Sequence, residues 1–397
     1  MIRFTCAHRG RVVVLVAVVA AILVVGSVVV TAIRRSQDSR VTVLTGAAAG
    51  AAERVHLRFQ PVPGTKRTVR LGTTVTTFKE GDQPQNGITT IESFVFDLEA
   101  MEPAEDGTAA IDVSMASIHV TSTMSGQVSA VYDSTEPPVE GDEYARSCSP
   151  FIANRFTVRV SPKGEVIDPG LDGLFLAAAE KRAKDEDDAL RNEFDEKSNQ
   201  ALRPKLEGLS PSEADQLKEM VKKANDQVME AINARSGSRK DRVLALKEQM
   251  EKSSVLGREQ VSGLVNRLMA VLPDEAVRIG DVWRGALPPQ VDVLPPIAGM
   301  YTLQATEQNV CTIWALGQRG LDEDLVIEEE PHIKVTSRLE GSSEGTLQVE
   351  RPTGWLRHRE QKTNLHGVVT TTIVGPQPRD ISDQISIEIT STLTTLK

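Results

Sequence analysis

Cysteine, histidine and aromatic residues are all scarce in this 397-residue chain, which has three cysteines, six histidines and 4% aromatic residues. Three cysteines are too few for the dense disulfide framework of a small secreted scaffold. The closest histidines, His358 and His366, do not have the spacing of a zinc motif. So few aromatic side chains also argue against a stacking platform for nucleic-acid bases.

Motifs for several common chemistries are missing too. The sequence contains no His-Glu-x-x-His zinc motif and no phosphate-binding Gly-x-x-x-x-Gly-Lys-Ser/Thr loop. The formal net charge is −10, and the basic residues are scattered among acidic ones, which excludes a nucleic-acid footprint. We therefore expect no enzyme activity, no catalytic, cofactor-binding or metal-binding residue, no cofactor and no nucleic-acid partner.

The sequence features that most resemble a metal site are groups of acidic residues. Asp185–Asp188 lies in a predicted helix, where adjacent positions point about 100° apart and cannot converge on one ion. Asp322–Asp324 and Glu328–Glu330 flank a short apolar patch in a predicted loop, where a loose calcium site is conceivable. The loop pattern of a calcium site is absent, so we expect charged decoration of a sheet edge there.

The longest feature that is present is an uncharged apolar run, Val12–Ile33, bracketed by arginines on both sides. A bilayer core about 30 Å thick needs about 20 helical residues, so this run is long enough to cross it. A cleaved signal peptide has a shorter apolar core that ends in a small-residue cleavage site. We expect an uncleaved transmembrane anchor, and Cys6 precedes the run instead of following it as in a lipoprotein.

The orientation of the anchor follows from the size of its flanks. Basic residues are almost balanced on the two sides, so the positive-inside rule decides little. A tail of residues 1–11 is too short to fold alone. We expect a cytoplasmic tail and a single-pass membrane protein whose body is extracytoplasmic, in the periplasm.

Cys148 and Cys311 are the two cysteines of that body. They could form a disulfide in an oxidising compartment, or remain two separate buried thiols, which is the alternative we favour. Trp283, Trp314 and Trp355 could line an apolar pocket, but we expect them in the core.

Two regions rich in Val, Thr and Ile flank a helical block. Alternating segments before and after the block predict antiparallel strands. The predicted strands are 67–78, 89–99, 109–123, 127–132, 155–160, 276–283, 300–305, 310–317, 333–339, 345–349, 355–363, 368–373 and 385–396.

The block itself, 171–272, is rich in Ala, Leu, Lys and Glu. Ser210, Pro211 and Glu213 form a capping box that starts one helix, and further helices are predicted over 239–252 and 258–272. The apolar stripe is narrow and the other faces are charged, which predicts an exposed helical arm or hairpin.

We predict an α+β protein: one N-terminal transmembrane helix, then a large antiparallel, half-barrel-like sheet built from both flanks, interrupted by a long helical insertion. The alternative is two β domains separated by a helical spacer. The expected divisions are a tail (1–11), an anchor (12–33), a linker (34–60) with a flexible Gly/Ala stretch, a first β region (61–170), the insertion (171–272) and a second β region (273–397) that completes the sheet.

Several local patterns occur in a characteristic order: Tyr132-Asp133-Ser134 with a Pro pair, Phe156 through Gly164, Gly280-Asp281 before Trp283, and Gly354-Trp355. In this order the chain resembles an uncharacterised family of bacterial envelope proteins, frequent in planctomycete-type bacteria, with an N-terminal anchor and an antiparallel β body. It also resembles, more loosely, the half-barrel sheets of lipoprotein carriers that hold acyl chains. Residues 178–256 depart from the family by their length and charge.

The resemblance implies a fold and a location but no catalytic site. We therefore expect an uncharacterised, membrane-anchored binding or scaffolding module of the cell envelope that performs no chemistry. The alternatives are a carrier or sensor of an apolar ligand or lipid in the sheet's concavity, and an unrecognised hydrolase. The expected partners are the membrane, through the N-terminal helix, and an apolar ligand or an envelope protein, with the helical arm as a route to homo-oligomers.

Overall fold

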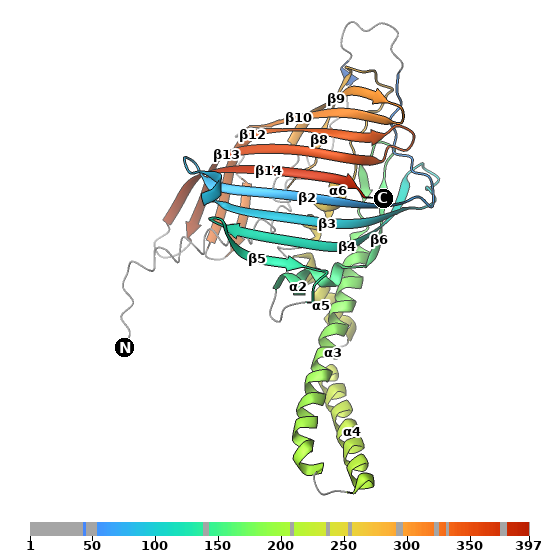
Figure 1. Cartoon of the computed structure of the whole chain (residues 1–397), viewed down its shortest axis with the longest axis vertical. Helices are drawn as coiled ribbons and strands as arrows, with labels where there is room; N and C mark the ends of the chain where they lie inside the picture. Colours follow the sequence, from blue (N-terminus) through green and yellow to red (C-terminus); the bar gives the residue numbers. More distant parts are fainter. Residues whose placement is uncertain are drawn as a thin grey trace. The chain divides into compact units, whose positions relative to one another are not determined.

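The structure is a computed structural model that describes residues 43–44, 54–137, 143–206, 210–235, 239–252, 256–290, 297–320, 325–330, 333–373 and 379–396 (Figure 1). The predicted tail and anchor, 1–33, and the Gly/Ala tether, 45–52, lie outside these residues. No helix in the described part of the chain is long and apolar enough to cross a membrane. The chain divides into two compact units, Met1–Leu171 with Lys252–Lys397, and Asp172–Glu251.

The first unit is built on one open antiparallel sheet of 14 strands. The order is β1-β8-β9-β10-β12-β13-β14-β2-β3-β4-β6-β7, with β11 paired to β12 and β5 paired to β4. The strands are β1 (Val43–Leu44), β2 (Lys66–Lys79), β3 (Ile88–Ala100), β4 (Ala109–Met124), β5 (Gln127–Asp133), β6 (Arg155–Val160), β7 (Val166–Asp168), β8 (Val282–Leu287), β9 (Ile297–Glu307), β10 (Val310–Arg319), β11 (Leu325–Glu330), β12 (Ile333–Glu350), β13 (Leu356–Ile373) and β14 (Arg379–Thr395).

The last strand of the chain joins the two β regions. β14 pairs with β2 over eleven residues of register, from Ile385 opposite Lys79 to Thr395 opposite Val69. The two regions therefore share one sheet, and the α+β class with an open antiparallel sheet is confirmed. The alternative of two separate β domains is wrong, because the pairing of β14 with β2 leaves no break between them.

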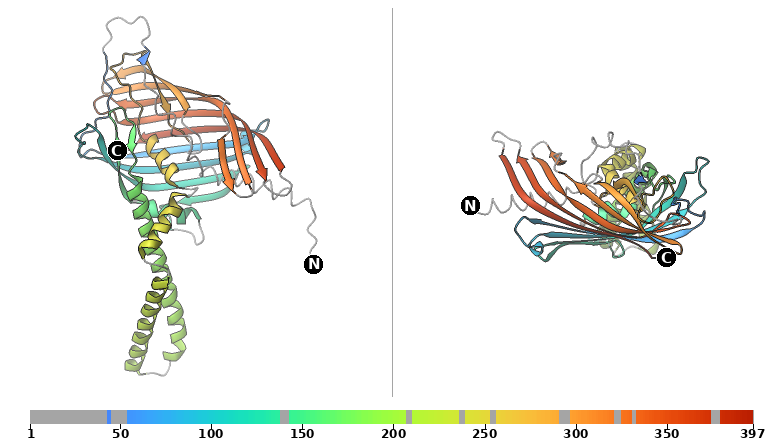
Figure 2. Two further views of the ribbon diagram at one scale, coloured as in Figure 1. Left: turned by 180° about the vertical axis from the view of Figure 1, so that it is seen from behind. Right: turned by 90° about the horizontal axis from the view of Figure 1, so that it is seen from above.

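Alternation along each strand gives the sheet two different faces. In β10 the side chains of Cys311, Ile313 and Ala315 are buried on one side, while Thr312 and Trp314 on the other side are half-buried. Because successive side chains point to opposite faces, the same division extends across the paired strands. We call the buried side the inner face and the other the outer face. Figure 2 shows the sheet curving, with helix α6 on its inner side.

The strands of the second region are longer than predicted. The predicted pair 333–339 and 345–349 is the single strand β12, and the pair 355–363 and 368–373 is the single strand β13. Gly341 and Gly367 fall in the two gaps between the predicted strands, but each sits inside a strand at a point where a Cβ would collide with the backbone of the neighbouring strand. Glycine here permits close backbone approach and curvature, and pairing continues on both sides.

Part of the predicted linker belongs to the sheet unit. Val55, Leu57 and Phe59 are all 1–2% exposed, and Val55 exchanges backbone hydrogen bonds with Val277. The predicted strand 276–283 is instead a turn followed by β8, because Asp281 accepts a hydrogen bond from the backbone of Arg278. Gly280 and Asp281 therefore belong to a turn that precedes and positions β8.

The remaining elements of the first unit are short helices. They are η2 (Pro84–Asn86), α2 (Glu143–Cys148), η3 (Ser149–Phe151) and α6 (Arg258–Arg267). Helix α6 ends at Arg267, before the predicted boundary at 272.

The second unit is helical, as predicted. It contains most of α3 (Leu171–Leu206), together with α4 (Pro211–Arg235) and α5 (Arg239–Glu251). The capping box is confirmed: the Ser210 backbone N–H and hydroxyl donate to the Glu213 carboxylate at 2.9 and 2.6 Å. These hydrogen bonds hold the pKa of Glu213 below its usual value.

Candidate ligand-binding site

Helix α6 covers part of the inner face of the sheet. It begins after Gly257 and buries Val261, Leu264 and Val265 on one side. The i, i+3, i+4 spacing of these residues forms the apolar stripe that a helix needs to pack against a sheet. Its last residue, Arg267, is only 2% exposed and reaches into the sheet.

Arg359 on β13 holds the C-terminal end of α6. The Arg359 guanidinium is 2% exposed and donates to the backbone carbonyls of Arg267 and Met269, at 2.8 and 2.6 Å. The last carbonyls of a helix lack partners within the helix and carry partial negative charge, so a cation there is favourable. Burial lowers the pKa of Arg359 to about 10, while nearby Tyr301 opposes and Arg267 adds to the shift.

Arg267 ties the same helix end to two other segments. Its guanidinium donates to the Thr73 hydroxyl on β2 at 3.1 Å and to the Gln290 carbonyl at 2.5 Å. Burial raises the pKa of Glu92 on β3, and the positive charge of Arg267 opposes that rise. Two arginines therefore fix α6 on the sheet from opposite sides, and this part of the concavity is filled by protein.

A polar row crosses the inner face beside these arginines. Glu92, Thr73, Ser391 and Gln361 lie opposite one another on β3, β2, β14 and β13. Thr73, Ser391 and Gln361 are 1–4% exposed. The buried amide of Gln290 has no hydrogen-bond partner for its side-chain oxygen or nitrogen among the described residues.

An apolar patch begins directly beyond the polar row. Along β13 the buried inner-face residues change from Arg359 through Gln361 and Thr363 to Leu365, that is, from charged to polar to apolar. The apolar patch consists of buried Leu339, Leu365 and Ile389, with partly buried Val75, Ile385 and Ile387 packed against them. β-branched and aliphatic side chains from four adjacent strands thus form one continuous surface that is not completely covered.

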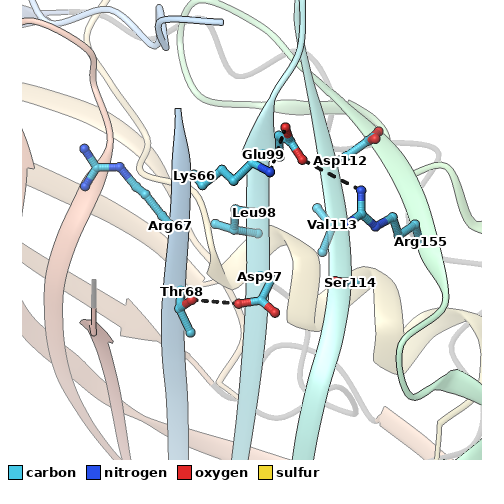
Figure 3. A pocket seen from close by; sticks show the side chains of 10 residues that line it. All are labelled: Lys66, Arg67, Thr68, Asp97, Leu98, Glu99, Asp112, Val113, Ser114 and Arg155. Carbon is cyan, nitrogen blue, oxygen red and sulfur yellow. Dashed lines mark hydrogen bonds and ion pairs between the residues drawn. The ribbon is translucent and has the colours of Figure 1, made fainter. Parts of the chain in front are cut away.

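Two hollows on the sheet are polar. The first, of about 270 Å³, lies over the ends of β2, β3, β4 and β6. Figure 3 shows the Lys66 ammonium and Arg155 guanidinium both facing the Glu99 carboxylate, at 3.4 and 3.7 Å, with the Thr68 hydroxyl donating to Asp97 nearby. The two cations are exposed and the Glu99 carboxylate between them is half-buried, so this hollow is a solvated surface of paired charges.

The second hollow, of about 550 Å³, lies where β13 begins and β14 ends. Arg67, on the inner face, pairs with Glu350 at 2.6 Å and lies over the Trp355 ring at 5.3 Å. Arg357 lies 3.8 Å from the same carboxylate. The Glu350 carboxylate balances the charges of the two arginines, and the Arg67 guanidinium packs over the buried Trp355 ring.

The tryptophans are divided between core and surface. Trp283 and Trp355 are 0–1% exposed, as predicted for core residues; Trp283 stacks on Tyr301 and Trp355 packs edge-on against Phe59. Trp314 is half-buried on the outer face of β10. None of the three lies in the apolar patch.

The structure keeps the two candidate disulfide cysteines apart. Cys148 and Cys311 are both buried thiols. Cys311 lies on β10, whereas Cys148 precedes a segment that bridges to Met115 on β4. Six strand spacings of about 4.8 Å separate β10 from β4, far beyond the Cα separation of up to about 7 Å that a disulfide tolerates. Burial raises the pKa of the Cys311 thiol.

The acidic and histidine candidates stay apart. Among the described residues no group of three or more Cys, His, Asp and Glu side chains could hold a metal ion. In the 185–188 run, Asp187 pairs with Arg242 at 2.6 Å inside the helical unit. Glu328–Glu330 forms the end of strand β11, and 322–324 lies outside the described residues. His366 on β13 contacts Glu340 on the neighbouring strand β12, and His358 on β13 contacts Thr394 on the neighbouring strand β14.

One serine pattern was missed in the sequence. Gly341-Ser-Ser343-Glu-Gly345 has the Gly-x-Ser-x-Gly spacing of a hydrolase nucleophile elbow, which requires a sharp strand-to-helix turn. Here the pattern lies within the continuous strand β12. The Ser343 side chain is 0% exposed, and its hydroxyl oxygen accepts hydrogen bonds from the Gln361 amide at 2.9 Å and from the Thr363 hydroxyl at 2.7 Å. The spacing therefore arises inside a sheet and does not present a nucleophile.

Comparison with known proteins gives a family match without a function. Residues 215–356 match the model of DUF6263, a family of unknown function. The match runs from α4 to the start of β13 and supports the resemblance to an uncharacterised family. No curated protein matches the chain.

Two solved structures show only distant likeness. One, titled "Lipid-protein interactions in lipovitellin", is 8% identical with a TM-score of 0.38, and the match covers 85% of this chain and 25% of that one. The other, titled "CymD monoaromatic hydrocarbon channel", is 7% identical with a TM-score of 0.10, and the match covers 84% and 89% of the two chains. This chain thus spans about a quarter of the length of the lipovitellin chain.

Proposed function

We propose that this chain is a non-enzymatic binding module that holds an apolar ligand, such as an acyl chain, against the inner face of its sheet. The apolar patch around Leu339, Leu365 and Ile389 is the observation that carries the proposal. Its rim residues Ile385 and Ile387 remain partly exposed. Partly exposed aliphatic side chains that adjoin a buried cluster are what a ligand-binding surface offers to an apolar molecule.

The filled part of the concavity limits the size and position of the ligand. Helix α6, held by Arg267 and Arg359, occupies the inner face on one side of the polar row. The ligand therefore lies along β12, β13 and β14 on the other side of that row. This placement favours one or two chains lying on the sheet over a large enclosed lipid pool.

Location is part of the proposal. The apolar run Val12–Ile33 and its flanking arginines support an N-terminal anchor with the folded body outside the cytoplasm. An anchored body of this kind would bring the apolar patch close to the membrane surface. The ligand would then be a membrane lipid or an acylated molecule of the cell envelope.

The test compares two aspartate variants of adjacent strands. Ile387→Asp places a charge in the apolar patch, whereas Val368→Asp places one on the outer face of β13, opposite Gln384. We expect a fluorescent fatty acid to bind the wild type and Val368→Asp equally, and Ile387→Asp at least ten times more weakly, since burying an unpaired charge is costly. Equal binding by all three proteins, each with an unchanged circular dichroism spectrum, would count against the proposal.

A second candidate function is scaffolding through the helical unit. Contacts between α3 and α4 include polar ones, such as Ser198 to Asn225 and Asn225 to Asp195, both at 3.1 Å. Meanwhile Met220 and Leu190 are exposed by 62% and 38%. Sedimentation of the protein with and without residues 178–256 separates this function from ligand binding, because only scaffolding requires the arm for assembly.

The absence of catalysis is also a proposal. An esterase, peptidase and glycosidase screen of the purified protein tests it directly. Turnover abolished by a single substitution would replace the binding module with a hydrolase.

A further inference from the structure

Strand β5 forms an exposed edge of the sheet. Among the described strands it pairs only with β4, through Met124 opposite Gln127 to His119 opposite Asp133. Val128 and Val131 are 65% and 56% exposed. Gln127 and Ser129 are exposed as well, so both faces of the first half of the strand are accessible. An edge strand carries a row of backbone N–H and C=O groups that can pair with a further strand.

A bulge brings the two valines to the same face. Register shifts between Ser122 and Thr123 of β4, and as a result Val128 lies opposite Thr123 and Val131 opposite Thr121. Thr121 and Thr123 are two residues apart and share the outer face. Tyr132, which points the other way, is 5% exposed and anchors the second half of the strand.

Other edges of the sheet are short or charged. β1 has two residues and β7 has three. β11 ends in three glutamates, Glu328–Glu330. Short length and charge are the devices by which natural sheets prevent edge-to-edge association. β5 has seven residues, and Gln127–Tyr132 contains no charged side chain and no proline.

We propose that β5 is a dimerisation edge that pairs antiparallel with β5 of a second copy of this chain, about a two-fold axis perpendicular to the sheet. Such pairing places Val128 of one copy opposite Val131 of the other, twice, on one continuous outer face. Pairs of β-branched residues stabilise neighbouring strands, and the uncharged sequence puts no like charges opposite each other. A two-fold interface uses the same surface on both copies, as this strand requires.

The inference is independent of the proposed function. Ligand binding uses the inner face of β12–β14, whereas this interface uses the edge and outer face of β5. It also differs from assembly through the helical arm, which does not involve β5.

The experiment is sedimentation of the full chain in detergent over a range of protein concentrations. We expect the wild type to pass from monomer to dimer, and Val131→Lys to remain monomeric over the same range. Val62→Lys is the control, because Val62 is 60% exposed and lies outside every strand; it should dimerise like the wild type. A wild type that stays monomeric at its highest soluble concentration, or a Val131→Lys variant that still dimerises, would overturn the proposal.

Disulfide trapping tests the register. In a Cys6→Ser background, Val128→Cys with Val131→Cys should give a covalent dimer under mild oxidation, and each single variant much less. The two positions of one chain are about 10 Å apart along the strand, too far to bridge within the chain. Equal trapping in the single and double variants would contradict this register and with it the proposed two-fold pairing.

Discussion

Arg359 should be among the most sensitive residues of the sheet unit, because it joins β13 to the end of α6. Replacing it by alanine removes two hydrogen bonds from a cation to buried carbonyls, those of Arg267 and Met269. Each buried carbonyl left without its partner costs about 1–3 kcal/mol, and the space left by the side chain adds to the loss. We expect Arg359→Ala to lower the free energy of unfolding by about 3–5 kcal/mol.

Two further variants separate the charge from the volume. Arg359→Met fills the space without burying a charge, so part of the loss should be recovered. Burial lowers the pKa of Arg359 to about 10, so the charged guanidinium carries a desolvation cost that methionine avoids. Arg359→Lys keeps a charge but cannot reproduce the two-pronged donation, so an intermediate loss is expected.

Urea unfolding followed by tryptophan fluorescence is the assay. All three tryptophans, Trp283, Trp314 and Trp355, lie in the sheet unit, so the signal reports on that unit and not on the helical one. Arg357→Ala is the control, since that side chain is about half exposed. It should change stability by less than about 1 kcal/mol. A loss for Arg359→Ala no larger than that of the control would refute the role assigned to Arg359.

Three further predictions concern the inner face and its surroundings. Burial raises the pKa of Glu92 above its ordinary 4.5, so the folded state binds this proton more tightly than the unfolded state, and stability falls as the pH rises from 4.5 to the raised pKa. Glu92→Gln should remove this contribution to the pH dependence of stability. If the unfolding midpoint changes equally between pH 4.5 and pH 7 in the wild type and in Glu92→Gln, the prediction is wrong. Gly341→Val should cost about 1–3 kcal/mol in the same urea titration, because its side chain meets the backbone of β13. Gly173→Ala, in helix α3 with open space around it, should instead stabilise the helical unit by up to about 1 kcal/mol, measured by urea unfolding followed by circular dichroism. Alkylation of the native protein should leave Cys148 and Cys311 unlabelled, because both thiols are buried. Alkylation after unfolding without reductant should label both, as measured by mass spectrometry. If both cysteines stay unlabelled after unfolding, they form a disulfide.

Periodicity was enough to predict most of the elements. Strands such as 109–123 and 155–160 follow from alternation alone, and the observed bounds Ala109–Met124 and Arg155–Val160 agree closely. The start of α4 was recoverable because Ser210 and Glu213 satisfy each other locally. Signals of this kind depend on neighbours within one turn or one strand, so a sequence displays them directly.

Long-range packing was not visible in the same way. The predicted strands end at 339 and resume at 345, because the sequence does not show that another backbone passes close to Gly341 within a continuous strand. Nothing in the sequence pattern distinguishes Arg359 and Arg267 from the other arginines, although the tertiary structure buries both at a helix end. The apolar patch joins residues of the consecutive strands β12, β13 and β14 to Val75 of β2, which lies far from them in the sequence. Alternating apolar residues predicted an inner face, but not which end of it α6 would leave uncovered.

Native mass spectrometry of the full chain, purified from its own membrane in a mild detergent, tests the proposed binding function most directly. We predict that the wild type and Val368→Asp retain bound lipid or acyl-chain mass, and that Ile387→Asp loses most of it while keeping the same fold by circular dichroism. If the wild type carries no such mass, or if Ile387→Asp retains it fully, the inner face of this sheet is not a binding site for an apolar ligand.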